Sequence, residues 1–411
     1  MTLRVFKNAS ALMVFQICNY LIPLIVIPFL VRTLGVESFG KWMFALSFII
    51  FIRVIVSYGF DLTASRQAAV EADDRTKLSK LLTSVTVCRL LIWVLCVFAI
   101  LLLSQFFRKI DEIKDLILIG SSIVLGEAIL PVWLFLGVER LGVITILRLC
   151  SRLTNLALLL VFVRGPLDTI LVPVFEGILS LALGCLALTM ASRTLGLRLS
   201  GLSFKEIKLQ ARSGAAVFVS TLSVQMYTTA HTIVLGMLIG PAAVTSYSIA
   251  EKVYSAVRGL LNPLIQAVFP VMARMHDSSR EEFSRTYKSA LSLILIFLLI
   301  VGALIFVCAP FIVRVVEGHF DHDTLVVMQL FASAFPFAIG GFLSPMLIVR
   351  GGDIYLMVIS IASGLLGIVL AIPLAVKLGA PGAALAFLAV QIFGAIALFL
   401  TNLKLAKQKI W

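Results

Sequence analysis

The stretch ILIFLLIVGALIFVCAPFIV, residues 294–313, decides the fold class because it carries no charge over about 20 positions. A helix of that length crosses the hydrocarbon core of a bilayer. Similar runs recur along all 411 residues, which are 61% apolar and 13% charged, with a mean hydropathy of +1.09. Soluble domains carry roughly 25% charged residues. The sequence therefore predicts one membrane domain that takes up the whole chain.

The apolar runs predict helices, because no segment shows the period-2 alternation of a membrane β-barrel strand. We expect an all-α integral membrane protein with twelve transmembrane helices. Their expected ranges are 8–32, 39–60, 81–104, 115–137, 141–163, 169–190, 213–239, 244–272, 289–316, 324–349, 354–376 and 380–403.

Basic residues set the expected orientation, because cytosolic loops of membrane proteins are enriched in Lys and Arg. With the amino terminus inside, 20 of the 34 basic residues fall on the cytosolic side and 8 on the opposite side. The net charge is then +10 inside, 0 outside and +3 within the spans. The total of +13 follows largely from this orientation and from attraction to anionic lipid, so no nucleic-acid partner is expected. We expect both termini in the cytosol.

Nine Arg, Lys and Glu residues lie well inside the predicted spans, away from their ends. A cation at that depth costs at least ~2.5–3.5 kcal/mol on the insertion scale, so such residues are rare and mark functional sites. The basic ones are Arg53, Arg89, Arg148, Arg152, Lys252 and Arg258, and the acidic ones are Glu127, Glu176 and Glu251. Six retained cations favour a polar route for an anionic substrate.

Arg148 and Arg152 are spaced i, i+4 on the fifth expected helix and therefore share one face. Arg152 lies near the middle of its span, too deep to reach the interface, which favours contact with substrate. The alternative is a structural ion pair with Glu127 or Glu176, which also lie mid-span.

An internal repeat with an offset of 205 residues relates the two halves of the chain. It aligns Gly35 with Gly240 and Arg53 with Arg258. Six helices separate the copies, so both run in the same direction, as in transporters with parallel halves. Arg53 and Arg258 then hold equivalent positions in the cytosolic half of the membrane. There each side chain either contacts the headgroup of the substrate or extends to the surface of the bilayer.

The remaining two cations have simpler explanations. Lys252 directly follows Glu251, about 100° around the helix, and a local ion pair is one interpretation. Arg89 lies close to the cytosolic boundary, where it either binds the substrate headgroup or only packs helices together.

A polar run interrupts the seventh expected helix at residues 225–232, QMYTTAHT. Side chains such as Gln225 and Tyr227 either bind a sugar or form hydrogen bonds across helices. His231 is a candidate proton-coupling group, with a plain hydrogen-bonded histidine as the alternative.

The chain carries no signature of an enzyme. It lacks the Gly-rich loop with Lys and Ser/Thr that binds nucleotide phosphates, and it lacks clustered metal ligands. We expect no catalytic activity, no metal and no cofactor.

Several short motifs resemble those of the polysaccharide-transporter family. They are Leu34-Gly35-Val36-Glu37-Ser38-Phe39-Gly40-Lys41-Trp42, Tyr58-Gly59-Phe60, Ser65-Arg66-Gln67-Ala68-Ala69 and Leu378-Gly379-Ala380-Pro381-Gly382-Ala383-Ala384. That family belongs to the multidrug/oligosaccharidyl-lipid/polysaccharide superfamily of exporters. The likeness spans essentially the whole chain and is greatest to O-antigen flippases of the Wzx type.

The resemblance implies two six-helix bundles, residues 1–200 and 201–411, that face each other around a central cavity. It implies a bacterial inner-membrane flippase that moves an undecaprenyl-diphosphate-linked oligosaccharide outward by alternating access. It also implies coupling to H⁺ or Na⁺ and contact with other polysaccharide-assembly proteins. A diphosphate needs cations in a dry site, and the +3 interior supplies them.

Two other classes remain open. A multidrug or small-cation antiporter of the same superfamily would concentrate acids in its cavity, whereas three acids face six bases here. A glycan polymerase or ligase would expose a large external loop, and no external connection here exceeds roughly fifteen residues.

Overall fold

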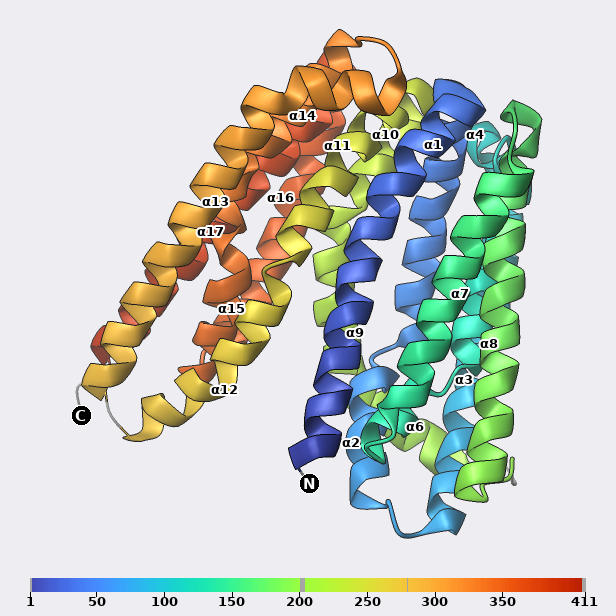
Figure 1. Cartoon of the computed structure of the whole chain (residues 1–411), viewed down its shortest axis with the longest axis vertical. Coiled ribbons are helices and arrows are strands. Elements are labelled where there is room, and N and C mark those ends of the chain that lie inside the picture. The colour runs from blue at the N-terminus through green and yellow to red at the C-terminus, as the bar shows by residue number, and fades with distance from the viewer. Residues whose placement is uncertain (1, 200–203, 279, 409–411) are drawn as a thin grey trace. The chain divides into compact units, whose positions relative to one another are not determined.

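The computed structural model describes residues 2–199, 204–278 and 280–408, and every regular element in them is a helix (Figure 1). Nine helical segments among these residues are long and apolar enough to cross a membrane. One of them, Leu21–Val70, takes in the predicted span 39–60 and the last part of 8–32. The more polar ranges 213–239 and 244–272 are not among the nine. The all-α membrane class is confirmed.

The contacts of the chain divide it into two compact units. The first unit consists of Met1–Asn19 and Thr33–Leu222, and the second consists of Tyr20–Arg32 and Ser223–Trp411. The first helix contributes segments to both units. In chain order the helices are α1 (Thr2–Ser57), α2 (Phe60–Val70), α3 (Arg75–Phe106), α4 (Arg108–Asp111), α5 (Lys114–Ile129), α6 (Val132–Gly137), α7 (Leu141–Phe162), η1 (Pro166–Ile170), α8 (Leu171–Leu195), α9 (Phe204–Thr228), α10 (Ala230–Leu238), α11 (Pro241–Gly259), α12 (Asn262–Ser278), α13 (Arg280–Glu317), α14 (His322–Ala334), η2 (Phe335–Ile339), α15 (Gly340–Val349), α16 (Asp353–Leu378) and α17 (Ala380–Gln408).

All twelve predicted ranges fall on helix, and the differences lie at breaks inside them. Four ranges predicted as single helices are divided, namely 115–137, 213–239, 244–272 and 324–349. Pro131 causes one of these breaks, because it has no amide hydrogen to donate to the preceding turn. In contrast, the first two predicted helices run on as α1, which bends at Gly35.

Gly35 and Gly240 share an unusual backbone conformation, with φ of 77° and 132°. A Cβ atom at either position would meet no other atom within 4 Å. Backbone conformation, not lack of space, therefore makes glycine suitable at both. Each glycine directly precedes the helical segment that carries an intramembrane arginine, Arg53 or Arg258. The sequence repeat thus has a counterpart in the backbone.

The order of the helices repeats as well. The last part of α1, α2 and α3 correspond to α11, α12 and α13, and α7 and α8 correspond to α16 and α17. Between these groups, α5 ends just before Pro131 and α14 ends just before Pro336, which lies 205 residues later. The two halves of the chain therefore use one helical plan.

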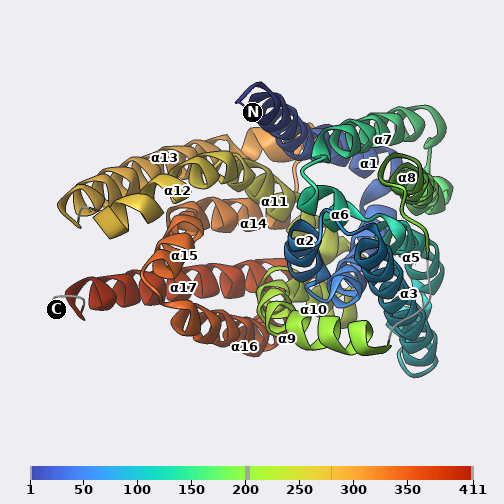
Figure 2. The same ribbon diagram turned by 90° about the horizontal axis from the view of Figure 1, so that it is seen from below.

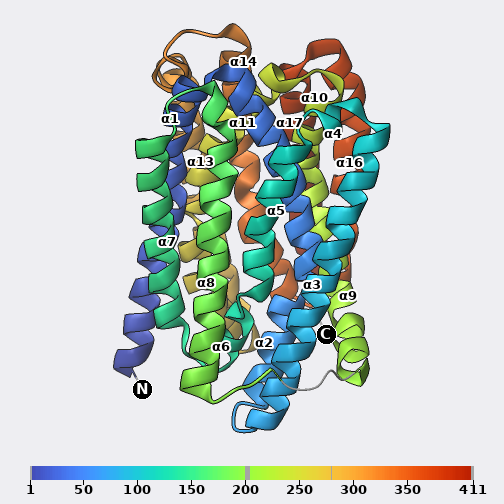
Figure 3. The ribbon, with the colours of Figure 1, turned by 90° about the vertical axis from the view of Figure 1, so that its right-hand side faces the viewer.

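In the first unit, α5 packs between α3 and α8, and α8 also contacts α7 (Figure 3). Trp93 Nε1 of α3 donates a hydrogen bond to Ser121 O of α5 at 2.9 Å. Ser180 Oγ of α8 donates to Ile123 O of α5 at 2.8 Å. Such bonds contribute to helix association in a membrane, where lipid is as apolar as the helix surface. They hold together three helices that carry intramembrane charges.

In the second unit, α17 packs against α14, α15 and α16 (Figure 2). An aromatic cluster, Tyr247, Tyr254, Phe331, Phe335 and Phe387, fills its interior, and each of these side chains is at most 3% exposed. The ring centroids of Phe331 and Phe387 lie 4.6 Å apart, and those of Tyr254 and Phe335 lie 4.8 Å apart. Aromatic pairs of this kind contribute about 0.5–1.5 kcal/mol beyond their buried area.

Candidate functional site

Arg148 and Arg152 lie one turn apart on α7, as their spacing predicts, and they line two adjoining cavities of the first unit. The first cavity has a volume of about 360 Å³ and the second about 250 Å³. The two cavities share Arg53, Glu127, Leu130 and Arg148. Arg152 lines the second cavity only.

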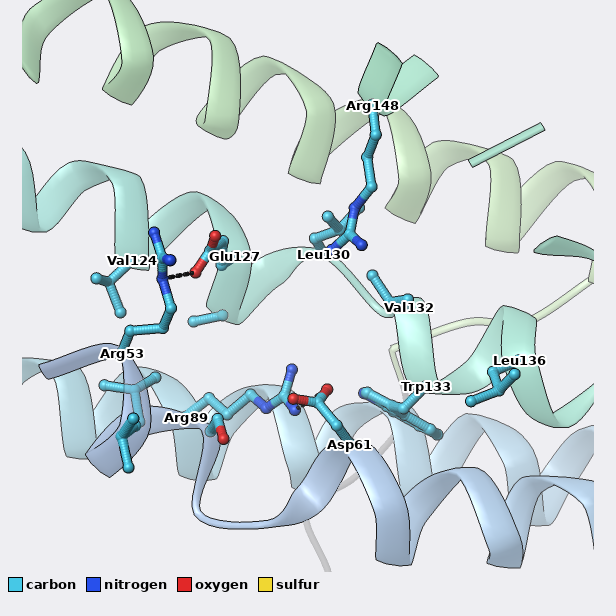
Figure 4. Close-up of a pocket in the computed structure, with 14 residues that line it drawn as sticks. Arg53, Asp61, Arg89, Val124, Glu127, Leu130, Val132, Trp133, Leu136 and Arg148 are labelled. Atoms are coloured by element: carbon cyan, nitrogen blue, oxygen red, sulfur yellow. Dashed lines mark hydrogen bonds and ion pairs between the residues drawn. The ribbon is translucent and has the colours of Figure 1, made fainter. Parts of the chain in front are cut away.

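Arg53 of α1 and Glu127 of α5 form the first ion pair of this site (Figure 4). The Nε atom of Arg53 lies 2.8 Å from Oε2 of Glu127, and each side chain is about one third exposed. Glu127 belongs to the last turn of α5, directly before the Pro131 break. The break therefore leaves the carboxylate beside the open volume of both cavities.

Asp61 and Arg89 form a second ion pair at the other side of the first cavity (Figure 4). The Nη2 atom of Arg89 donates to Oδ1 of Asp61 at 2.7 Å. The Arg89 side chain is 4% exposed and the Asp61 side chain 61%. The Arg89 guanidinium also lies 5.9 Å from the ring centroid of Phe60, a cation–π contact.

A tight turn at Tyr58 and Gly59 places Asp61 in the first turn of α2. Both turn residues have positive φ, 44° and 79°. A Cβ atom on Gly59 would lie 2.8 Å from Gly214 O of α9, so only glycine permits this approach. Tyr58 compensates for its strained backbone by stacking on Phe218, with ring centroids 4.8 Å apart. The tight turn and its close approach to α9 therefore explain why the residues Tyr58-Gly59-Phe60 occur here.

Arg152 and Glu176 form a third ion pair, which lines the second cavity. The Nη1 atom of Arg152 donates to Oε1 of Glu176 on α8 at 3.1 Å. The sequence left two explanations open for Arg152, a contact with substrate or a structural ion pair. In this structure Arg152 forms the ion pair, and its partner is Glu176. Arg152 keeps a side-chain exposure of 43%, so the pair also faces the open volume.

Arg148 differs from the other three arginines. It extends from α7 towards Leu130, and it forms no ion pair within 4.0 Å among the described residues (Figure 4). It also lines both cavities, so its guanidinium lies at their junction. Arg148 is therefore the cation of this group that has charge to offer an incoming ligand.

We call these seven residues the arginine cluster: Arg53, Asp61, Arg89, Glu127, Arg148, Arg152 and Glu176. Its four arginines and three carboxylates leave a net charge of +1. Each carboxylate is held by one arginine, which satisfies the charges at low dielectric. The remaining positive charge belongs to Arg148.

Three of the other predicted site residues belong to α11 in the second unit. The Nζ atom of Lys252 lies 2.9 Å from Oε2 of Glu251, which is the local pair that their adjacency suggests. Ser255 Oγ also donates to Oε1 of Glu251 at 3.0 Å. Arg258 is half-buried and forms no ion pair within 4.0 Å in the described part of the chain.

In the polar run of residues 225–232, at the junction of α9 and α10, some side chains bond to residues of their own helix. Gln225 Nε2 donates a hydrogen bond to Thr229 Oγ1, one turn later. His231 is fully buried beside the aromatic cluster, with its ring stacked on Tyr247 at a centroid distance of 6.1 Å. The side chain of Tyr227 lies outside the described residues.

Sequence reasoning missed two residues of this site. Asp61 follows the second predicted span in a polar run. The charge count therefore assigned it to the cytosolic side and not to the site. Asn155 is a neutral side chain on α7, one turn beyond Arg152, and it lines the second cavity. Its spacing of i+7 from Arg148 and i+3 from Arg152 is the signal that could have found it.

Comparisons with known proteins agree with this architecture. A family model described as "Polysaccharide biosynthesis protein" matches residues 5–276, more than half of the chain. A "Putative O-antigen transporter" of Escherichia coli (strain K12) is 29% identical over 409 residues, which cover 97% of each chain. A protein of the same description from Shigella dysenteriae is 24% identical and covers 94% of this chain and 97% of its own.

Solved structures of membrane transporters share the fold. The lipid II flippase MurJ, in an inward closed conformation, matches with a TM-score of 0.68 and 16% identity, over 99% of this chain and 90% of that one. An inward-facing multidrug resistance MATE family transporter of the MOP superfamily matches with a TM-score of 0.72 and 15% identity, over 95% of this chain and all of that one. The twelve helical ranges therefore follow a transporter fold.

Proposed function

This chain belongs to the polysaccharide biosynthesis protein family, and we propose that it is a flippase for an undecaprenyl-diphosphate-linked oligosaccharide. It moves this lipid, an O-antigen repeat unit or a similar glycan, from the cytosolic to the periplasmic leaflet. Transport proceeds by alternating access of two six-helix bundles, residues 1–200 and 201–411. Both termini lie in the cytosol of a bacterial cell.

The observation that carries the proposal is the guanidinium of Arg148, which lies at the junction of two cavities and forms no ion pair with any described residue. A diphosphate is a compact anion with several acceptor oxygens, and a planar guanidinium binds such groups with two parallel hydrogen bonds. Arg53 and Arg152 line the same volume and can turn towards the anion from either side. The low dielectric of the site strengthens each of these contacts.

The names of the relatives support a glycan-linked substrate. Both curated relatives are described as O-antigen transporters, and the chain covers 97% of each. We propose that Glu127 and Glu176 take part in coupling to H⁺ or Na⁺, because each can release its arginine to the anion. We propose Arg89, Lys252 and Arg258 as further headgroup-binding residues. The further proposed coupling or polar residues are Glu251, His231, Gln225 and Tyr227. The partners are the lipid-linked glycan, the bilayer and other polysaccharide-assembly proteins.

A second candidate is a multidrug or small-molecule antiporter, which the likeness to a MATE family transporter favours. An antiporter for cationic drugs needs surplus negative charge in its binding site. The arginine cluster has a surplus of one positive charge instead. We therefore rank this candidate below the flippase.

The experiment is a gene deletion in the bacterium that encodes the chain, complemented with wild-type or variant protein. We expect the deletion to accumulate lipid-linked repeat units on the cytosolic leaflet and to lose surface polysaccharide. Arg148→Ala should not restore transport, whereas Arg108→Ala, a control at a fully exposed arginine, should restore it. Normal surface polysaccharide in the deletion strain would contradict the flippase, and export of cationic dyes by the protein would favour the antiporter.

A further inference from the structure

The second cavity contains a hydrogen-bond acceptor that nothing in the described structure uses. The Oδ1 atom of Asn155 is buried and has no hydrogen-bond partner among the described residues. Native proteins seldom leave a buried polar atom unbonded, so this oxygen requires a donor other than the described residues. Asn155 lines the cavity, which places that donor in its open volume.

The volume has room for a ligand and not only for one ordered water. The second cavity measures about 250 Å³, whereas one water needs only about 10–15 Å³ of such space. Its wall combines polar groups with the apolar side chains of Leu179 and Leu183. Eight of the twelve described residues that line it are polar or charged, so the wall favours a polar ligand over an apolar one.

The polar groups of this wall suit a polyhydroxylated ligand. Asn155 offers an acceptor and an amide donor, Ser151 offers a hydroxyl, and the Arg152–Glu176 pair offers a donor and an acceptor side by side. Each sugar hydroxyl is both donor and acceptor, so a wall of mixed donors and acceptors can bind several of them. A fully ionised phosphate, which only accepts hydrogen bonds, would leave Asn155 Oδ1 without a donor.

We infer that the second cavity binds the sugar attached directly to the diphosphate, and that Asn155 accepts a hydrogen bond from its hydroxyl or amide group. The inference rests on the proposed function. Because Arg148 lines both cavities, a diphosphate bound there places the next group of the substrate at the second cavity. Asn155 is then a specificity-determining residue for the sugar, while Arg148 binds the anion that all such lipids share.

The test measures binding to the purified full-length protein in lipid nanodiscs. The three probes are undecaprenyl phosphate, undecaprenyl diphosphate and undecaprenyl-diphosphate-linked N-acetylglucosamine. We expect the wild type to bind the sugar-bearing lipid about fivefold or more tighter than undecaprenyl diphosphate, the effect of one neutral hydrogen bond in a dry site. Asn155→Ala should remove that preference and leave the Kd for undecaprenyl diphosphate unchanged.

Two further variants keep the test decisive. Asn155→Asp keeps a hydrogen-bond acceptor, so it should keep the preference for the sugar-bearing lipid over undecaprenyl diphosphate. This variant provides the test if Asn155→Ala does not fold. Thr154→Val changes the exposed neighbour on the same helix and should behave as the wild type. A wild type without preference for the sugar, or a full preference in Asn155→Ala, would overturn the inference. Failure of both diphosphates to bind better than undecaprenyl phosphate would instead overturn the proposed function.

Discussion

The two units follow one helical plan but fill it with opposite chemistry. Four residues before Pro131 the first unit has Glu127, paired with Arg53 beside two cavities. Four residues before Pro336 the second unit has Ala332, 2% exposed and next to Phe331 of the aromatic cluster. The same backbone break thus opens a charged volume in one unit and is packed with rings in the other. The difference indicates that the residues before this break carry ligand chemistry in the first unit and pack a rigid core in the second.

The largest expected effect is a loss of stability on substitution in the aromatic cluster, without a loss of ligand binding at the arginine cluster. Phe331→Ala removes a buried ring that contacts Tyr247, Tyr254 and Phe387, and should lower the free energy of unfolding by about 3–5 kcal/mol. Scanning fluorimetry of the purified protein measures the loss. Phe311→Ala, at a 70% exposed phenylalanine, is the control and should change stability little. If Phe331→Ala folds but loses affinity for the diphosphate, the aromatic cluster has a role in ligand binding, which would contradict this division between the two units.

The next effect concerns the charge of the site. Glu127→Gln removes one carboxylate without changing its size, so the arginine cluster rises from +1 to +2 and Arg53 is released. Undecaprenyl diphosphate should then bind about threefold to tenfold tighter, equal to about 0.7–1.4 kcal/mol. Titration in nanodiscs measures this change. Glu112→Gln, a surface control, should leave the Kd as in the wild type, and unchanged affinity in Glu127→Gln would argue against an electrostatic role.

A smaller effect is expected at Arg152 and Glu176. Each single alanine variant leaves one charge of the pair unmatched, and the double variant removes both. A double-mutant cycle on thermal stability should therefore give a coupling of about 0.5 kcal/mol, limited by the exposure of Arg152. Strict additivity of the two single variants would show that the pair does not stabilise α7 against α8.

The smallest effect lies outside the spans, where Asp74 caps α3. Its carboxylate accepts the amide hydrogens of Lys77 and Thr76, and the bond from Lys77 is the main reason that the pKa of Asp74 is lowered from its ordinary 3.8. The cap therefore contributes fully above pH 3.8 and is lost as the pH falls through the lower folded pKa. Melting temperature against pH checks this, with Asp74→Asn as a cap that does not titrate.

The sequence predicted the helices well because each depends on local patterns. Apolar runs located all twelve ranges, i, i+4 spacing placed Arg148 and Arg152 on one face, and adjacency suggested the Glu251–Lys252 pair. The repeat that aligns Gly35 with Gly240 also reflects local backbone demands.

The sequence could not decide which charges meet. Arg53 and Glu127 are 74 positions apart, and only packing of α1 against α5 brings them together. Asp61 follows a turn whose positive φ values direct it back towards Arg89, a feature that hydropathy does not report. For the same reason the sequence could not show that Arg152 pairs with Glu176, or that Arg148, alone of the four arginines in the arginine cluster, forms no ion pair among the described residues.

The most direct test of the central claim is the Kd for undecaprenyl diphosphate of the wild type, Arg148→Ala and Arg148→Lys in nanodiscs. A charge-assisted hydrogen bond contributes about 1.5–3 kcal/mol, so Arg148→Ala should bind roughly 10- to 100-fold more weakly with an unchanged melting temperature. Arg148→Lys should recover part of this affinity, because it restores the charge without the planar fork. Equal affinity of the wild type and Arg148→Ala would contradict the account.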